Sequence, residues 1–266
     1  MKRQLAALLL TIFALSLTAC GETAAESETR TVYAMDTVMN LTVYGENAAA
    51  ALESAEKELH TLDEAVLSRT AEGSELYALN TSNGETVEYG ADDILPALIE
   101  TALTISDATD GAFDPTLAPV LDAWGFTKDE HRVPSADELK ELLSHTGCGK
   151  VALEKTADGW TVTLFDGAQL DLGGIAKGYA ADLLRAQLEK EGVTSATLDL
   201  GGDVFVMGRK TDGGDWRIAV KDPADTESYL GVVSAADKFI VTSGVYERYF
   251  EENGCLLYTS DAADEL

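Results

Sequence analysis

The sequence predicts an α+β fold, with helices packed on a mainly antiparallel sheet. Amphipathic helical patterns dominate the first half of the chain, and short apolar strand patterns separated by Asp-Gly and Gly-Gly turns follow from Lys150. Helices early and strands late are typical of α+β domains, whereas strands and helices alternate in doubly wound parallel sheets. The first 30 residues have the features of a leader and tether, described below, and about 235 of the 266 residues remain for the fold. We therefore expect one domain with a sizeable core.

The N-terminus has the features of a signal peptide. Two basic residues precede an apolar run, Leu5–Leu17, which is too short to span a membrane comfortably. The quartet Leu17–Cys20 resembles a bacterial lipobox, so we expect cleavage after residue 19 and lipidation of Cys20. Residues 20–30 would then tether the chain to the extracytoplasmic face of the cell membrane. An ordinary signal peptide with a chance cysteine is the alternative.

Four helices are expected in the mature chain. Leu52, Ala55, Leu59, Leu62 and Val66 recur at steps of three and four, the period of an amphipathic helix. Similar spacing marks a helix over Leu95–Ile105, and Ser135 with Glu138 forms a capping-box pattern. The last expected helix covers Ile175–Glu191.

The expected strands are short and rich in β-branched and aromatic residues. Near the start, Arg30–Tyr44 is expected to form two short strands or one bent strand. The later strands are expected at 151–153, 160–164, 196–200, 204–208, 216–220 and 229–233.

Composition excludes two classes of function. A formal net charge of −28 at pH 7 argues against nucleic-acid binding, because the phosphates would be repelled. The three histidines are scattered without ligand spacing, so no zinc site is expected. Beyond Cys20 only Cys148 and Cys255 remain, which excludes a disulfide scaffold.

The segment QLDLGGIAKGYAA, Gln169–Ala181, is the strongest candidate for chemistry. Paired glycines open a helix, whose free N–H groups and dipole favour an anion. Lys177 lies in the first turns and would meet a phosphate as a point charge. Neither standard nucleotide-binding glycine motif is present. Phosphate binding and a purely structural Gly-Gly turn remain equally supported by these residues alone.

Two further segments are candidates for a site. Thr109–Phe126 is expected to be a loop, in which Phe113 and Trp124 either flank a planar ring or belong to the core, the core being favoured. Leu198–Val204 places paired glycines between two strands, as in a hairpin turn.

These segments, with Met35-Asp36-Thr37 before them and Thr242–Arg248 after them, give the chain a resemblance to a known family. The sequence resembles the ApbE family of FAD:protein FMN transferases over residues 31–254. The resemblance implies transfer of FMN from FAD to a threonine of a partner protein through a phosphoester bond, with release of AMP. It also implies a magnesium ion, Mg²⁺, which suits phosphate oxygens.

The resemblance assigns site residues position by position. FAD contacts are implied at Met35, Thr70, Ala112, Phe113, Asp114, Asp171 and Lys177. The Gly174 backbone carbonyl is implied as a magnesium ligand. Asp36 replaces the glycine usual in the family's first motif, which leaves the local turn open.

The resemblance also concerns the C-terminal end. The family's histidine motif, which would supply the general base, and its Asp-x-x-x-Thr magnesium site have no counterpart in these 266 residues. Residues 255–266 are expected to be a non-native tail and the last part of the fold to be missing, so the catalytic residue is unknown. We expect little or no transferase activity from these residues alone.

Two other functions are compatible with the same motifs. One is a magnesium-dependent FAD pyrophosphatase, and the other is a flavin-binding lipoprotein without catalysis. For the transferase, the implied partners are flavin-acceptor subunits of membrane redox complexes of the Nqr or Rnf type, or proteins with an FMN-binding domain.

Overall fold

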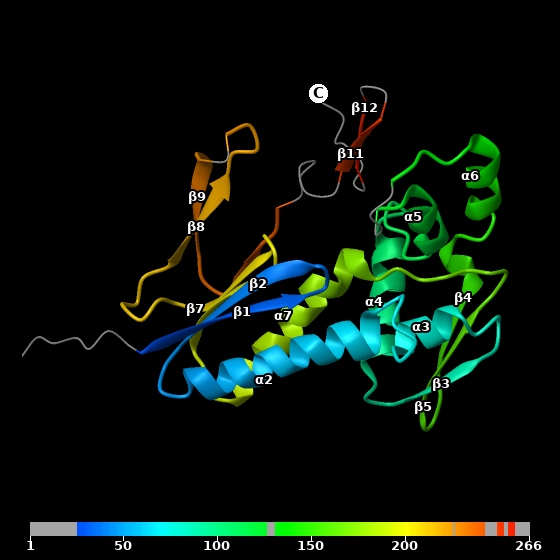
Figure 1. Ribbon diagram of the computed structural model, residues 1–266. Coiled ribbons are helices and arrows are strands. Elements are labelled where there is room, and N and C mark those ends of the chain that lie inside the picture. The colour runs from blue at the N-terminus through cyan, green and yellow to red at the C-terminus, as the bar shows by residue number, and fades with distance from the viewer. Residues whose placement is uncertain (1–25, 127–130, 226, 243–248, 253–254, 259–266) are drawn as a thin grey trace, which may run out of the picture.

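The structure of the protein, a computed structural model, describes residues 26–126, 131–225, 227–242, 249–252 and 255–258 (Figure 1). Its centre is a five-stranded sheet in the order β1-β2-β6-β7-β10, in which every neighbouring pair is antiparallel. The strands are β1 (Ser27–Ala34), β2 (Thr37–Tyr44), β6 (Ser195–Asp199), β7 (Val204–Gly208) and β10 (Lys238–Ile240). This arrangement confirms the predicted antiparallel sheet and the two-strand alternative for Arg30–Tyr44.

Three helices form the layer on the buried face of this sheet. α2 (Ala48–His60) packs on β1 and β2, and α7 (Gly173–Lys190) lies beside α2, as Figure 1 shows. α4 (Ile94–Ala108) contacts α7 as well. Along β2 burial alternates, with Met39, Leu41 and Val43 inside, because successive side chains of a strand point to opposite faces. The predicted helices therefore form, and their apolar stripes make the core.

The apolar stripe of α2 continues through a change of helix type. η2 (Thr61–Leu67) follows α2 without a break as a π-helix, with Leu62 and Val66 still buried. A π-helix is rare and is often found near functional sites. η2 ends at Leu67, Ser68 is extended, and the side chain of the next residue, Arg69, is largely buried.

A smaller layer contains a three-stranded antiparallel sheet in the order β3-β5-β4. Its strands are β3 (Val87–Gly90), β4 (Val151–Lys155) and β5 (Gly159–Leu164), accompanied by α3 (Glu75–Asn80), α6 (Ala136–Leu143) and the 3-10 helix η3 (Cys148–Lys150). At α6 the Ser135 hydroxyl accepts from the Glu138 N–H, as predicted. The Glu138 carboxylate pairs with Arg132, so this capping box is not reciprocal.

The prediction of a loop throughout Thr109–Phe126 is wrong in part. Ala118–Trp124 forms a helix, α5. Pro119 is tolerated in its first turn because those N–H groups have no intrahelical acceptor, and Gly125 ends it in the left-handed conformation with φ 78°. Glycine and proline at these positions thus delimit a helix.

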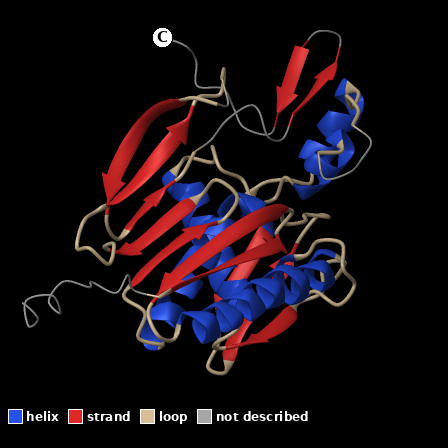
Figure 2. Ribbon diagram, turned by 60° about the vertical axis from the view of Figure 1, so that its left-hand side comes forward, coloured by secondary structure: helices blue, strands red, loops and turns tan. Residues whose placement is uncertain are grey.

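Two hairpins form separate two-stranded sheets (Figure 2), and the first of them packs on the central sheet through Trp216 and Val206. They are β8 (Trp216–Lys221) with β9 (Tyr229–Ala235), and β11 (Tyr249–Glu252) with β12 (Cys255–Tyr258). On β9, Tyr229, Leu230 and Val232 are more than half exposed, at 63%, 67% and 51%. The predicted boundary at Gly254 falls between β11 and β12, and it stays a prediction. The predicted signal peptide and Cys20 lie outside the described residues.

The turn between β6 and β7 gives a test of the fold. A Cβ on Gly201 would lie 2.2 Å from Thr37 Oγ1, at a φ of +78° that side chains rarely adopt. We expect Gly201→Ala to lower the free energy of unfolding by about 3 kcal/mol, from overlap and backbone strain together. Urea denaturation followed by circular dichroism measures this.

Its neighbour is the matched control. Gly202 has a φ of +92°, but a Cβ on it would meet nothing within 4 Å, so Gly202→Ala introduces strain without overlap. We expect a cost of about 1 kcal/mol. Equal costs for the two variants would contradict the close contact with Thr37.

Candidate functional site

Two turns meet at one end of the central sheet. Met35 and Asp36 form the β1–β2 turn with φ 51° and 56°, the double left-handed conformation of the turns preferred in two-residue hairpins. Aspartate tolerates this conformation better than most residues, so the turn forms without the family's glycine. Beside it, Gly201 and Gly202 turn the chain from β6 to β7, and the Gly202 N–H donates to Asp199 Oδ1 at 2.8 Å. The predicted hairpin turn is confirmed.

The N-terminus of α7 is shaped by Asp171. Its Oδ1 accepts from the Gly173 N–H at 2.8 Å, and its own N–H donates to the Pro115 carbonyl at 2.8 Å. The Ile175 and Ala176 N–H groups donate to the Leu172 carbonyl at 3.0 and 2.9 Å, so among the first four amides of α7 that of Gly174 is the one left for an outside acceptor. It is therefore suited to an anion, as the sequence predicts.

Phe113 connects the second predicted segment to this helix terminus. A Cβ on Gly174 would lie 3.0 Å from Phe113 Cε2, so the ring edge rests against the glycine. Phe113 also packs against the main hydrophobic core, which agrees with the core alternative. Gly174 is thus required for a close approach, besides the carbonyl role that the family resemblance assigns to it.

Lys177 faces the β6–β7 turn. Its Nζ lies 3.8 Å from Asp203 Oδ2, and each side chain is 25% exposed. At that distance the pair is longer than a hydrogen bond, so the ammonium donors stay available to a phosphate. The sequence singled out the segment that contains Asp203 but missed the carboxylate itself. The signal available in the sequence was an acidic residue, Asp203, directly after the paired glycines of the turn.

The Asp114 side chain makes hydrogen bonds within its own loop. Its Oδ1 accepts from the Thr116 N–H and hydroxyl at 2.8 and 2.6 Å, and Thr116 Oγ1 accepts from the Gly147 N–H at 2.6 Å. Ala112, near it in the chain, is exposed. The structure therefore gives Asp114 a positioning task within the predicted FAD segment, and leaves Ala112 open to solvent.

The structure gives no contact between the predicted residue Thr70 and the α7 terminus, but it places the neighbouring residue Arg69 against Asp171. Thr70 is exposed, and its N–H lies 3.4 Å from Ser68 Oγ. Arg69 is only 12% exposed, and its Nε lies 2.9 Å from Asp171 Oδ2. The sequence missed this contact, because a single arginine far along the chain from its partner has no spacing signal.

Trp124 belongs to a separate aromatic cluster. Its ring lies 6.3 Å from that of Phe126 at 29°, and Phe250 of β11 lies 5.3 Å from Phe126 and 4.9 Å from His131. Trp124 is half-buried and belongs to neither hydrophobic core cluster, so the core interpretation holds for Phe113 and not for Trp124.

The described residues do not form a magnesium site. In the part of the chain that the structure describes, no three histidine, cysteine or acidic side chains converge as metal ligands. The Gly174 carbonyl is therefore the one ligand assigned by resemblance to a described residue, and no catalytic step is derived through a metal.

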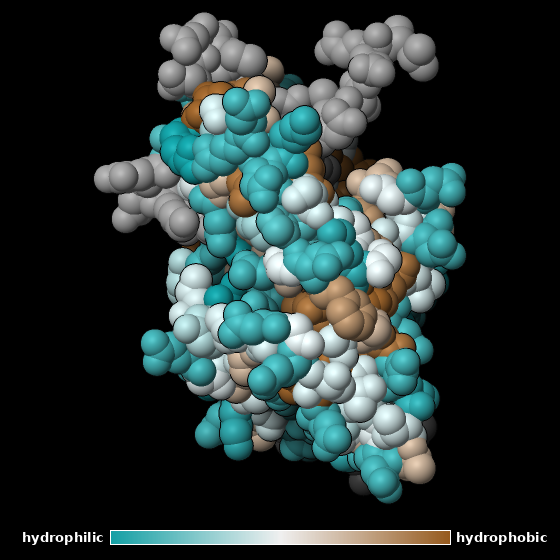
Figure 3. Space-filling view, turned by 90° about the vertical axis from the view of Figure 1, so that its right-hand side faces the viewer, coloured by the Kyte–Doolittle hydropathy of each residue, from teal (hydrophilic) through white to brown (hydrophobic). Residues whose placement is uncertain are grey.

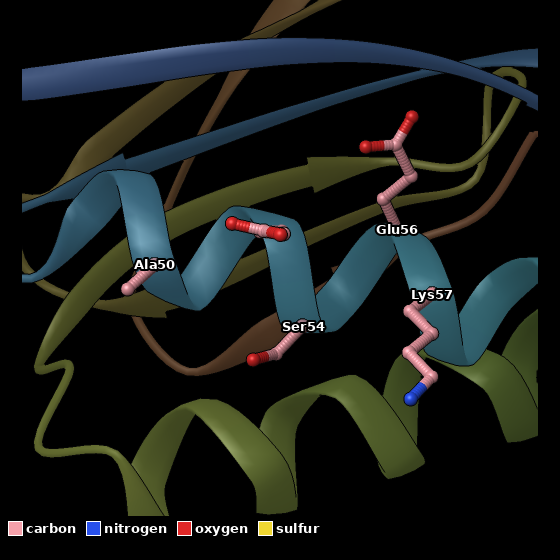
Figure 4. A pocket seen from close by; sticks show the side chains of 5 residues that line it. Ala50, Ser54, Glu56 and Lys57 are labelled. Carbon is pink, nitrogen blue, oxygen red and sulfur yellow. The ribbon is translucent and has the colours of Figure 1, made fainter.

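Of two hollows elsewhere on the surface, the first involves none of these motifs, and the second includes Gln169, the first residue of the segment Gln169–Ala181. The first lies on α2 and is lined by Ser54, Glu56 and Lys57 among others, and in Figure 4 the Glu56 and Lys57 side chains leave the helix in opposite directions. The second is lined by Asn80, Asp166 and Gln169 among others. Figure 3 shows a face on which hydrophilic side chains predominate, as the net charge of −28 leads one to expect. Among the described residues, no helix is long and apolar enough to cross a membrane.

Fold and site together define a domain of the flavin transferase class. The ApbE protein of Thermotoga maritima superposes with a TM-score of 0.80 at 33% identity, covering 88% of this chain and 75% of that one. The flavinyl transferase ApbE of Pseudomonas stutzeri, in its apo form, superposes with a TM-score of 0.76 at 29% identity, covering 90% and 74%. Both comparisons agree with the predicted α+β fold.

Sequence comparison gives the same result. The chain belongs to the ApbE family, which it matches over residues 35–259. A relative from Treponema pallidum (strain Nichols), named FAD:protein FMN transferase, is 36% identical over 254 residues, covering 88% of this chain and 69% of the relative. One of the same name from Haemophilus influenzae is 27% identical, covering 96% and 76%.

The Cys148 thiol reports on the geometry around Asp114. Cys148 Sγ lies 3.1 Å from Ser106 Oγ and 3.9 Å from Asp114 Oδ1. Burial raises the thiol pKa, the Ser106 hydroxyl lowers it by stabilising the thiolate, and the Asp114 carboxylate raises it. We expect Asp114→Asn to speed alkylation by iodoacetamide near pH 8.5 and Ser106→Ala to slow it, because only the thiolate reacts.

The measurement uses a chain with Cys20 and Cys255 replaced by serine, so that one thiol is followed. The pH midpoint of the alkylation rate should fall for Asp114→Asn and rise for Ser106→Ala. Shifts of the same sign in both variants would contradict the arrangement.

Proposed function

We propose that this protein is an FAD:protein FMN transferase that joins FMN to a threonine hydroxyl of a partner protein and releases AMP. The observation that carries the proposal is the meeting of the α7 N-terminus, Lys177 and Phe113 at one place. Its relatives are named for this activity. An exposed helix terminus with a lysine suits the pyrophosphate of FAD.

The proposed reaction requires charge stabilisation on phosphate. The threonine oxygen attacks the phosphorus of the FMN half, a new phosphorus–oxygen bond forms, and the anhydride bond to AMP breaks. The hydroxyl proton leaves to a base, and AMP takes the bonding electron pair. Lys177 and the Gly174 amide of α7 would hold the phosphate oxygens, because preorganised donors stabilise the charge that develops there.

We also propose that the reaction depends on Mg²⁺. A hard divalent ion would neutralise charge on the pyrophosphate oxygens. The support is the family resemblance, together with the Gly174 position at the α7 terminus. Since three acidic, histidine or cysteine side chains do not converge among the described residues, the Mg²⁺ dependence is tested by the incubation with Mg²⁺ or a chelator described below.

The proposed setting is the extracytoplasmic face of the membrane. The signal-peptide pattern and the Leu17–Cys20 quartet support a lipid anchor. The proposed acceptors are flavin-carrying subunits of membrane redox complexes, of the Nqr or Rnf type, or FMN-binding domain proteins. Because β1 begins at Ser27, residues 27–30 of the expected tether belong to the central sheet, and the segment from Cys20 to the start of β1 would link the domain to the membrane.

We expect Cys20→Ala to move the protein from the membrane fraction to the soluble fraction, because it removes the acylated thiol. Cell fractionation with immunodetection measures the distribution. Cys148→Ala, which leaves the lipobox intact, is the matched control. A Cys20→Ala variant that stays in the membrane fraction would be evidence against lipidation.

We expect Lys177→Ala to weaken FAD binding by roughly 10-fold to 100-fold, since charge-assisted contacts contribute about 1.5–3 kcal/mol. Quenching of flavin fluorescence on titration gives the dissociation constant. Lys190→Ala, in the last turn of the same helix, is the control and should bind normally.

The product identifies the activity. The chain is incubated with FAD, an acceptor domain, and Mg²⁺ or a chelator, beside the Treponema pallidum relative as the positive control. An acceptor that stays fluorescent after denaturation supports the transferase, and free FMN with AMP supports the pyrophosphatase instead. Bound but unchanged FAD would agree with a flavin-binding protein and with the expectation of little or no transferase activity from these residues alone, and absence of FAD binding would contradict all three functions.

A further inference from the structure

We propose that Arg69 is a positioning residue that sets the nucleotide-binding turn through Asp171. The proposal rests on the proposed function, because it concerns how that site is prepared for the FAD pyrophosphate. Arg69 is not among the residues that the sequence motifs indicate, and its role follows from contacts that only the fold creates.

Arg69 joins two parts of the site. Its Nε lies 2.9 Å from Asp171 Oδ2, and its Nη1 donates to Asp122 Oδ1 of α5 at 3.2 Å. The side chain is 12% exposed and that of Asp171 is 19% exposed. An ion pair so shielded is screened less than a surface pair, and the rigid guanidinium fork fixes the orientation of its acceptors.

The Asp171 carboxylate is held from two sides. Arg69 binds Oδ2, while Oδ1 accepts from the Gly173 N–H at 2.8 Å. The backbone beneath is fixed separately, since Asn80 exchanges hydrogen bonds with the Leu170 N–H and carbonyl at 2.7 and 2.9 Å. Asn80 therefore positions the main chain, and Arg69 positions the side chain that caps the helix.

This arrangement also balances charge at the helix terminus. A free carboxylate there would repel a phosphate and would compete with it for the first-turn N–H groups. Paired with Arg69, Asp171 occupies the Gly173 N–H without presenting uncompensated charge. The Gly174 amide and Lys177 are then left to meet the anion.

We expect Arg69→Gln to weaken FAD binding by roughly 10-fold or more, from loss of a charge-assisted contact and exposure of the Asp171 charge. Arg69→Lys keeps the charge without the fork and should recover part of the affinity. Arg185→Gln is the control, because Arg185 lies on α7 in an exposed pair with Glu189. Thermal denaturation of each variant separates binding from folding.

A double-mutant cycle tests the charge argument. Asp171→Asn alone should weaken FAD binding, since Asp171 caps the turn. In the Arg69→Gln background the same change should strengthen binding, because it removes the unpaired charge. Opposite signs support positioning by Arg69. Weakening in both backgrounds would show that Arg69 acts only as a structural contact.

A measurement without ligand keeps this test independent of the proposed function. Hydrogen exchange of the Gly173 amide, followed by NMR, should become faster in Arg69→Gln and stay unchanged in Arg185→Gln. Unchanged exchange together with unchanged FAD affinity would overturn the proposal. If the unaltered chain binds no FAD, the proposed function fails, while the exchange result still decides whether Arg69 positions Asp171.

Discussion

The pairing of β2 with β6 is the constraint on which the rest of the structure depends. It joins the N-terminal hairpin to strands more than a hundred positions later, with Leu41 opposite Leu198 on the buried face. A slip of one residue would turn that face outward, so the register is strongly specified. The same register brings the Met35–Asp36 turn beside Gly201 and closes one end of the sheet. The site segments, distant in sequence, become neighbours as a consequence of core packing.

The candidate anion site contains few cationic side chains, and the whole molecule has a formal net charge of −28. At the α7 terminus Asp171 occupies the Gly173 N–H, the Gly174 N–H is left as a backbone donor, and Lys177 is the nearby cationic side chain. Of the two carboxylates nearby, Asp171 is paired with Arg69, whereas Asp203 lies 3.8 Å from Lys177, beyond hydrogen-bond distance. An acidic protein can thus present a locally favourable surface to a dinucleotide because the local dipoles outweigh the distant charge at short range.

Much of this organisation could be predicted from the sequence, because periodicity and glycine turns are local signals. The helix that begins at the paired glycines, the later strands from 151 to 233 and the Gly201–Gly202 turn were expected, whereas β3 and β10 were not. Helix α5 was not, since its Pro119 and Gly125 resemble loop residues until their places at the two helix ends are known. The π-helix η2 could not be predicted either, because its apolar residues continue the helical spacing of α2 without a change. The role of Arg69 could not be predicted, because its partner is set by tertiary structure.

The exposed apolar side of β9 bears on how the protein behaves in solution. Tyr229, Leu230 and Val232 face solvent on a two-stranded hairpin. At low ionic strength, mutual repulsion between molecules with a charge of −28 keeps such hairpins apart. The Debye length shrinks to about 8 Å at physiological salt, which removes most of that barrier. Colloidal stability should therefore fall as salt rises, the reverse of ordinary salting-in, and dilute buffer is the condition in which to keep the protein monodisperse.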